Sequence, residues 1–165
     1  MKFLNIIRHG EAENSLIKND FDRELSLKGH EDLKELNKFL FQFILKKHKI
    51  LCSTSKRTIQ TYENIKYSLN EDSNLLLTDD LYLANLKTIY NVLLEQKKSR
   101  MITIIGHNPG VSDLVSFFTS NYEIPDLNTS SIAQIYFNNE KKIGEGEGSI
   151  KFIVQASNKS INSII

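Results

Sequence analysis

The chain has 165 residues, 40% of them hydrophobic and 25% charged, which excludes a disordered chain and predicts one globular domain over residues 1–165. A formal net charge of +1 is not typical of a nucleic-acid-binding protein. A single cysteine excludes an internal disulfide, and we therefore expect a cytoplasmic protein. No apolar run approaches the ~20 residues that span a bilayer, and the apolar run at 3–7 is too short for the core of a signal peptide.

The first half of the chain predicts strands that alternate with helices. Leucines at helical spacing after Ser26, which is a favoured N-cap residue, indicate a long first helix. The elements expected here are a strand at 2–7, a helix from 27 to about 48, a strand at 50–52, a helix from about 56 to about 68, and a strand at 75–77. Residues 53–55 are expected to cap the N-terminus of the second helix.

The second half continues this alternation and ends in strands. Asn108 is the expected N-cap and Pro109 the expected first residue of the last helix. The elements expected here are helices at 85–98 and 109–120, a strand at 101–105, and strands at 131–137 and 150–155 around a polar loop at 138–148. This order predicts a three-layer α/β/α sandwich with a mostly parallel central sheet.

Polar residues follow three of the predicted strands directly. Arg8 and His9 follow the first strand, Ser53 and Arg57 the second, and His107 follows the strand at 101–105. Since ligands of parallel α/β sheets bind at the carboxyl ends of the strands, these side chains are expected to meet. Two imidazoles and two guanidinium groups form a cationic site, and phosphate is the ligand that suits it.

The use of arginine supports a phosphate site. The chain has 17 lysines but four arginines, so ordinary surface charge is carried by lysine. Arg100 lies in a polar turn and is interpreted as a surface residue, whereas Arg8, Arg23 and Arg57 have surroundings typical of a binding site. Gly10 and Gly106 lack side chains and are expected to let the backbone approach a ligand closely.

The histidines have different expected roles. His9, at a strand end between Arg8 and Gly10, fits a nucleophile that attacks phosphorus, and His107 fits a hydrogen-bond donor to the same phosphoryl group. His30 and His48 are interpreted as ordinary residues on the surface of the first helix.

Other phosphate chemistries fit the sequence less well. A cysteine-dependent phosphatase needs Cys-x5-Arg, but Cys52 and Arg57 are one residue too close, and Cys52 is interpreted as a small buried hydrophobic residue. No nucleotide-binding P-loop motif is present. A metal site is not expected, because the arginines beside His9 and His107 would repel a cation.

Several motifs in the same order resemble the histidine phosphatase superfamily, the phosphoglycerate-mutase-like proteins, and within it the SixA-type phosphohistidine phosphatases. The motifs are Arg8-His9-Gly10-Glu11-Ala12, the segment 23–29, Ser53-x3-Arg57-x2-Gln60-Thr61, the segment 81–84, the segment 106–110, and the segment 129–133. The resemblance covers residues 2–155 and implies the phosphoglycerate-mutase-like fold.

The resemblance also implies the roles of the site residues. It implies that His9 is transiently phosphorylated while Arg8, Arg57 and His107 hold the phosphoryl group. It further implies that Arg23 assists, and that Asn14 or Ser15 contacts phosphate or shapes the entry loop. The implied enzyme is a hydrolase without cofactor or metal, and its implied partner is a phosphorylated histidine on a phosphotransfer protein in signal transduction.

One departure from the family pattern bears on the substrate. Where many members carry an acidic residue as general acid, this chain has Leu83, with Asp79 and Asp80 nearby. Imidazole, with a conjugate-acid pKa near ~6.5, leaves without the proton donor that an alkoxide needs, so phosphohistidine is favoured. Two alternatives stay open: a general phosphomonoesterase that uses Asp79 or Asp80, and a phosphate- or phosphopeptide-binding module with negligible turnover.

Overall fold

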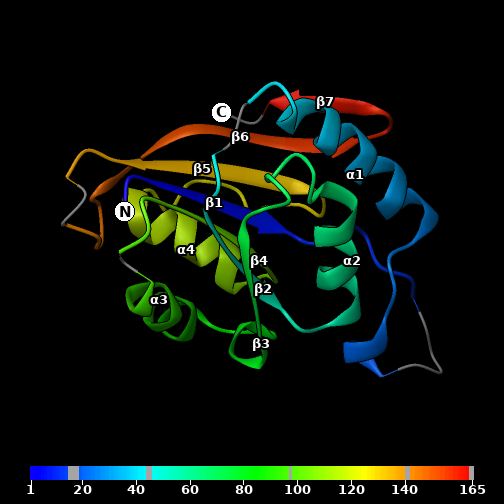
Figure 1. The fold of residues 1–165 in the computed structure, drawn as a ribbon, viewed down its shortest axis with the longest axis horizontal. Helices are drawn as coiled ribbons and strands as arrows, with labels where there is room; N and C mark the ends of the chain where they lie inside the picture. Colours follow the sequence, from blue (N-terminus) through cyan, green and yellow to red (C-terminus); the bar gives the residue numbers. More distant parts are fainter. Residues whose placement is uncertain (15–18, 44–45, 97, 140–141, 164–165) are drawn as a thin grey trace.

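A seven-stranded sheet in the order β3-β2-β4-β1-β5-β6-β7 forms the centre of the computed structural model, which describes residues 1–14, 19–43, 46–96, 98–139 and 142–163 (Figure 1). The strands are β1 (Phe3–Arg8), β2 (Lys49–Ser53), β3 (Asn74–Thr78), β4 (Met101–Gly106), β5 (Ser131–Phe137), β6 (Gly148–Ser157) and β7 (Ser160–Ser163). Strands β1 to β4 run parallel, and β5 to β7 add antiparallel pairs beside β1. The expected parallel arrangement is therefore found in the part of the sheet formed by β3, β2, β4 and β1.

Helices cover both faces of the sheet, which confirms the three-layer α/β/α sandwich (Figure 1). The helices α1 (Leu27–Leu40) and α2 (Lys56–Ile65) lie on one face, and α3 (Leu86–Glu95) and α4 (Gly110–Thr119) lie on the other. Short 3-10 helices, η1 (Asp20–Asp22) and η2 (Asp79–Leu81), lie in the connections after β1 and β3. Among the described residues, no helix has the length and apolar character needed to cross a membrane.

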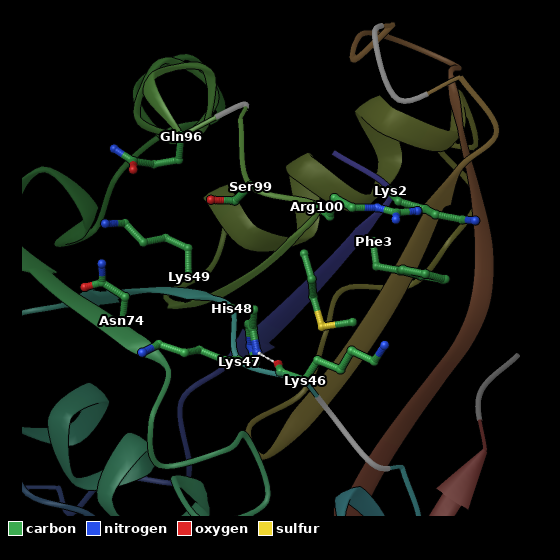
Figure 2. Close-up of a pocket in the computed structure, with 11 residues that line it drawn as sticks. Lys2, Phe3, Lys46, Lys47, His48, Lys49, Asn74, Gln96, Ser99 and Arg100 are labelled. Atoms are coloured by element: carbon green, nitrogen blue, oxygen red, sulfur yellow. Dashed lines mark hydrogen bonds between the residues drawn. The ribbon is translucent and has the colours of Figure 1, made fainter.

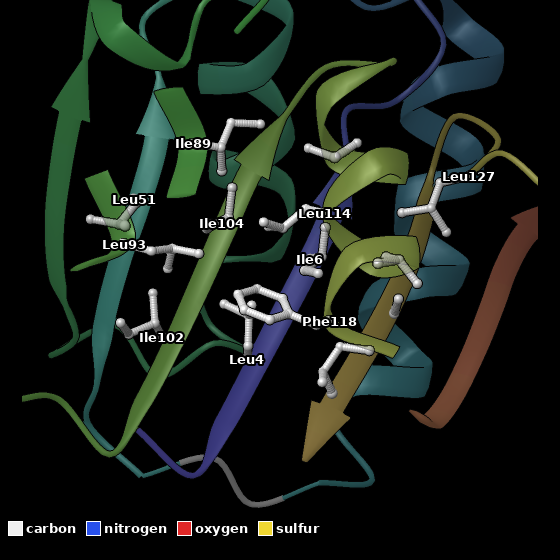
Figure 3. Close-up of a cluster of buried hydrophobic side chains, with 14 of the residues drawn as sticks. Leu4, Ile6, Leu51, Ile89, Leu93, Ile102, Ile104, Leu114, Phe118 and Leu127 are labelled. Carbon is white, nitrogen blue, oxygen red and sulfur yellow. The ribbon is translucent and has the colours of Figure 1, made fainter. Parts of the chain in front are cut away.

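Successive side chains of the central strands enter two separate cores. Leu4 and Ile6 of β1 pack with Phe118 of α4 on one face (Figure 3), whereas Ile7 packs with Leu33 of α1 on the other. All four aliphatic side chains have 0% exposure, because helices cover both faces of the sheet. The two cores hold the ends of β1 and β4 in place beneath the site described below.

The first helix is shorter than its apolar spacing predicts. Ser26 is its N-cap as expected, with Oγ accepting a hydrogen bond from the backbone N–H of Gly29 at 3.0 Å, but α1 ends at Leu40. Beyond Leu40, Phe43 stacks on Phe152 of β6 from a turn, at a centroid distance of 5.4 Å. Phe43 thus reaches β6 without continuing the helix.

The expectation that His48 lies on a helix surface is wrong. It precedes β2 and is buried, with Nδ1 donating to the carbonyl of Lys46 at 2.9 Å and Nε2 accepting from the hydroxyl of Thr103 at 2.8 Å. His30 does lie on α1, half-buried and within hydrogen-bond distance of Asn64.

Two further expectations differ from the structure. Pro109, not Asn108, is the N-cap of α4, because the Asn108 side chain is engaged elsewhere: it donates to the carbonyl of Leu127 at 2.9 Å and accepts from Ser112 at 2.7 Å. Strand β7 was not expected, since its short, mostly polar sequence Ser160–Ser163 lacks an apolar alternation.

Candidate active site

The two strand-end histidines lie side by side. Arg8 at the end of β1 is in register with Gly106 at the end of β4, so the residues that follow, His9 and His107, leave the sheet as neighbours. The backbone N–H of His9 donates to the carbonyl of Gly106 at 3.2 Å, and its carbonyl accepts from Ser130 at 3.1 Å. The two imidazole centroids are 5.0 Å apart. Residues far apart in sequence therefore meet where the parallel strands end.

Arg57 joins the two rings. It lies in the first turn of α2, is 2% exposed, and its Nε donates to Nε2 of His9 at 3.2 Å. Its Nη2 lies 3.3 Å from Nδ1 of His107. A guanidinium has donors and no acceptor, so both imidazole nitrogens that face Arg57 accept.

The remaining ring nitrogens carry hydrogen and orient the rings. Nδ1 of His9 donates to the carbonyl of Gly10 at 2.6 Å, which leaves the lone pair on Nε2. Nε2 of His107 donates to the hydroxyl of Ser53 at the end of β2, at 2.9 Å. Both rings thus present an unprotonated nitrogen to the same guanidinium group.

The surroundings keep both imidazoles neutral. Burial lowers the pKa of His9 to about 4; its hydrogen bond to the Gly10 carbonyl opposes this, and the charge of Arg57 adds to it. Burial, His9 and Arg57 lower the pKa of His107 to about 3. Near neutral pH, Nε2 of His9 is therefore unprotonated, as a nucleophile requires.

A cavity of about 660 Å³ opens above the two histidines. Arg8, Arg23, Arg57 and Asn14 line it, together with carboxylates of Glu11, Glu13 and Asp20. Arg8 donates from Nη1 to the carbonyl of Leu127 at 2.6 Å, while its Nε is buried and has no hydrogen-bond partner among the described residues. A buried cationic donor of this kind suits an anion bound in the cavity.

Asp20 is a member of the site that the sequence analysis did not identify. Its Oδ2 accepts from Nη2 of Arg57 at 2.9 Å and from the hydroxyl of Tyr82 at 2.7 Å, and its Oδ1 accepts from Arg23 at 3.0 Å. Together, the Tyr82 hydroxyl and the two arginines hold the pKa of this carboxyl far below its usual range. Its position three residues before Arg23 was a signal, since that spacing in a helical turn brings the two side chains together.

The expectation that glycine lets the backbone approach a ligand is not supported at either position. A Cβ on Gly10 would lie 2.8 Å from Cδ1 of Leu33, and one on Gly106 would lie 3.0 Å from Cγ1 of Val111. These glycines make room for the helices that pack on the sheet ends. Gly10 does not line the cavity; its carbonyl orients His9. Ser15, named with Asn14 above, lies outside the described residues.

The acidic pair after β3 lies outside the cavity lining. Asp79 and Asp80 are exposed, and Asp79 accepts a hydrogen bond from the hydroxyl of Thr54. Leu83 does line the cavity, with a backbone φ of 48°, which is unfavourable for a leucine. Among the described residues, no group of three or more His, Cys, Asp or Glu side chains is placed to hold a metal ion.

Residues 4–82 match the family model of the histidine phosphatase superfamily (branch 1). A comparison with curated proteins gives no match.

Solved structures of several phosphatases are similar to this chain. The protein histidine phosphatase SixA complexed with tungstate is 23% identical, with a TM-score of 0.78, and the alignment covers 93% of this chain and 97% of that chain. The α-ribazole phosphatase from Shigella flexneri is 14% identical, with a TM-score of 0.70, and 97% and 98% of the two chains are covered. A mycobacterial glucosyl-3-phosphoglycerate phosphatase is 11% identical, with a TM-score of 0.66, over 96% and 99%. Residues 4–82 thus match the histidine phosphatase superfamily by sequence, and the chain as a whole has the histidine phosphatase fold, with SixA phosphohistidine phosphatases among its structural neighbours.

Proposed function

We propose that this protein is a phosphohistidine phosphatase that removes phosphate from a phosphorylated histidine of a phosphotransfer protein through a phospho-His9 intermediate. The observation that carries the proposal is the position of Arg57, which donates to Nε2 of His9 and to Nδ1 of His107. A phosphoryl group held by this guanidinium would lie against both rings.

In the first step, Nε2 of neutral His9 forms a bond to phosphorus. The bond between phosphorus and the substrate imidazole breaks, and its electron pair stays on that ring, which leaves as neutral imidazole because its other nitrogen carries a proton. Arg57 and Arg8 stabilise the charge on the phosphoryl oxygens, which is the main contribution to catalysis in such transfers. The hydrogen bond from Nδ1 of His9 to the Gly10 carbonyl keeps the attacking ring oriented.

In the second step, water attacks the phosphorus of phospho-His9. The new P–O bond forms as the P–N bond breaks, both water protons stay on the released dihydrogen phosphate, and His9 returns to its neutral form. His107 has a low pKa because it is buried beside like charges, and a phosphoryl dianion would reverse this effect. Nδ1 of His107 would then carry a proton and donate to a phosphoryl oxygen.

The surroundings of the cavity support a phosphohistidine substrate. Leu83 lines the cavity at the position where the family resemblance implies a general acid, and Asp79 and Asp80 do not line it. Phosphohistidine does not need that acid. Exposed apolar side chains near the entrance, Leu83 at 52% and Phe21 at 36%, also favour contact with a protein surface.

The decisive experiment measures turnover and the intermediate together. Phosphoramidate, a phosphorylated histidine phosphotransfer domain and an alkyl phosphate are each mixed with the protein, and rapid-quench mass spectrometry locates phosphate. The proposal predicts acid-labile phosphate on His9, slower loss of it in His107→Ala, and a rate at least about a thousandfold lower in His9→Ala. The matched control is His30→Ala, which removes a histidine that packs against Asn64 on α1.

Two results would contradict the proposal. Hydrolysis of the alkyl phosphate alone would identify a general phosphomonoesterase. Tight phosphate binding with neither turnover nor phospho-His9 would identify a binding module.

A further inference from the structure

Figure 2 shows a second cavity, of about 730 Å³. It lies at the end of the sheet where β1 begins, whereas His9 follows the other end of β1. It is formed where β1, β2 and β4 begin, since Phe3, Lys49 and Met101 open these strands and line it. The described residues that line it are Lys2, Phe3, Lys46, Lys47, His48, Lys49, Asn74, Gln96, Ser99, Arg100 and Met101. Its volume is within the range of small-molecule sites, and none of the proposed catalytic residues belongs to it.

The charge of this lining is one-sided. Five of its described residues are lysine or arginine, and none is a carboxylate, although the whole chain has a net charge of only +1. Among the described residues, Lys46, Lys47 and Lys49 make no salt bridge. In contrast, Lys28 and Lys38 of α1 and Lys66 at the C-cap of α2 each pair with an acidic residue. Lys46, Lys47 and Lys49 therefore bring positive charge to the cavity that no carboxylate of the described residues neutralises.

The segment that carries these lysines is held in place. His48 is buried, and its ring links the carbonyl of Lys46 to the hydroxyl of Thr103 in β4. Thr103 accepts a hydrogen bond from Asn5 of β1 at 3.0 Å, which extends the link across the sheet. The buried imidazole thus fixes the backbone between Lys46 and Lys49, so that part of the site is formed before a ligand binds.

The rest of the lining supplies apolar surface and amide groups. Phe3 and Met101 are half-buried apolar side chains, and Asn74 and Gln96 add donors and acceptors. In Figure 2, Lys47 and Lys49 extend toward the side of Asn74 and Gln96, while Lys46, Arg100 and Lys2 extend to the other side. Such a lining suits a ligand that combines several negative charges with a flat, heteroatom-bearing apolar part.

We infer that this cavity binds a nucleoside polyphosphate, at a site separate from the one that holds His9. The ammonium groups of Lys47 and Lys49 pair with the phosphates, to which the neighbouring amides of Asn74 and Gln96 donate hydrogen bonds. The base packs against Phe3 and Met101, and Lys46 adds positive charge from the other side of the cavity. This inference goes beyond the proposed phosphatase activity and does not depend on it.

The test uses the methionine methyl groups as reporters. The chain has two methionines, Met1 and Met101, and Met101 lines the cavity. The His9→Ala variant of the 165-residue chain is labelled with ¹³C at the methionine methyls and titrated with ATP without divalent metal. The additional substitution Met101→Leu assigns the two signals. Saturable movement of the Met101 signal is expected, with an affinity that falls as salt rises. Saturation elsewhere, with Met101 unmoved, would overturn the proposal.

Two comparisons test the ligand and the lysines. The triple variant Lys46→Gln/Lys47→Gln/Lys49→Gln is expected to bind ATP at least about tenfold more weakly. The matched control Lys34→Gln/Lys87→Gln/Lys159→Gln removes the same charge from exposed positions outside the cavity and is expected to keep the affinity. An equal loss of ATP affinity in both variants would overturn the proposal. Tripolyphosphate that binds as tightly as ATP would also overturn it. So would an acidic peptide that shifts the Met101 methyl signal when ATP does not.

Discussion

Nη2 of Arg57 lies 2.9 Å from Oδ2 of Asp20, so the guanidinium group that contacts both histidines also holds a carboxylate. Tyr82 and Arg23 bond to the same carboxylate. A phosphoryl group that enters the cavity therefore meets arginines already paired with a negative charge, and Asp20 competes with it for them.

Replacing Asp20 by asparagine should strengthen anion binding. Asp20→Asn removes a negative charge from the cavity and keeps the size of the side chain, so the affinity for sulfate should rise about fivefold. Isothermal titration calorimetry measures this change. Asp22→Asn is the control, because Asp22 lies on the same 3-10 helix but bonds to Asn19 outside the cavity. A loss of sulfate affinity in Asp20→Asn would mean that Asp20 serves mainly to position Arg57.

The buried histidines should make the protein less stable in acid. The pKa values of His9 and His107 are about 4 and about 3 in the folded protein, whereas imidazoles of an unfolded chain have values near ~6.5. Between about pH 6.5 and about pH 4 the unfolded state binds more protons, so the free energy of unfolding should fall as the pH is lowered through this range.

Urea denaturation at a series of pH values measures this dependence. The slope should be reduced in His107→Gln and retained in His30→Gln, whose histidine lies half-buried on α1. An unchanged slope in His107→Gln would contradict the assignment of the pH dependence to the site.

The acidic pair after β3 should have little effect on phosphohistidine hydrolysis. Asp79 and Asp80 are exposed and do not line the cavity, so Asp79→Asn/Asp80→Asn should change kcat/KM for phosphoramidate by less than about twofold. Asp72→Asn, an exposed carboxylate in another turn, is the control. If the double variant lost the hydrolysis of an alkyl phosphate that the unmodified protein performs, the general phosphomonoesterase would be the better assignment.

Cys52 should take no part in turnover. It is 0% exposed within β2, and burial raises the pKa of its thiol to about 12, so iodoacetamide should not modify it in the folded protein. Cys52→Ala should keep the rate of phosphoramidate hydrolysis while lowering the free energy of unfolding by about 1 kcal/mol. Turnover and urea unfolding of the same sample measure the two effects, and a loss of turnover at unchanged stability would indicate a cysteine-dependent reaction.

The sequence predicts those parts of the site that the sheet itself positions. Arg8 ends β1, and His9 and His107 directly follow β1 and β4, so the alternation of strands and helices was enough to bring them to one edge. Arg57 needed one further assumption, that the helix after β2 begins close to the strand end. The structure supports it, because α2 begins at Lys56.

The rest depends on contacts that local patterns do not contain. Asp20 and Tyr82 meet in space across a sequence separation of 62 residues, and the short helices η1 and η2 beside them lack an apolar periodicity. The end of α1 depends on the stacking of Phe43 on Phe152 of β6. The burial of His48 depends on its hydrogen bond with the hydroxyl of Thr103 in β4. Where tertiary partners decide a conformation, spacing along the chain does not identify it.

The division of the site between sheet and connection has a practical consequence. His9 and His107 directly follow β1 and β4, whose side chains pack in both cores. In contrast, Asn14, Asp20 and Arg23 belong to the connection between β1 and α1. Exchanging that connection for another of similar length should therefore redirect substrate choice while sparing the reacting groups, which makes it the natural target for directed evolution of this scaffold.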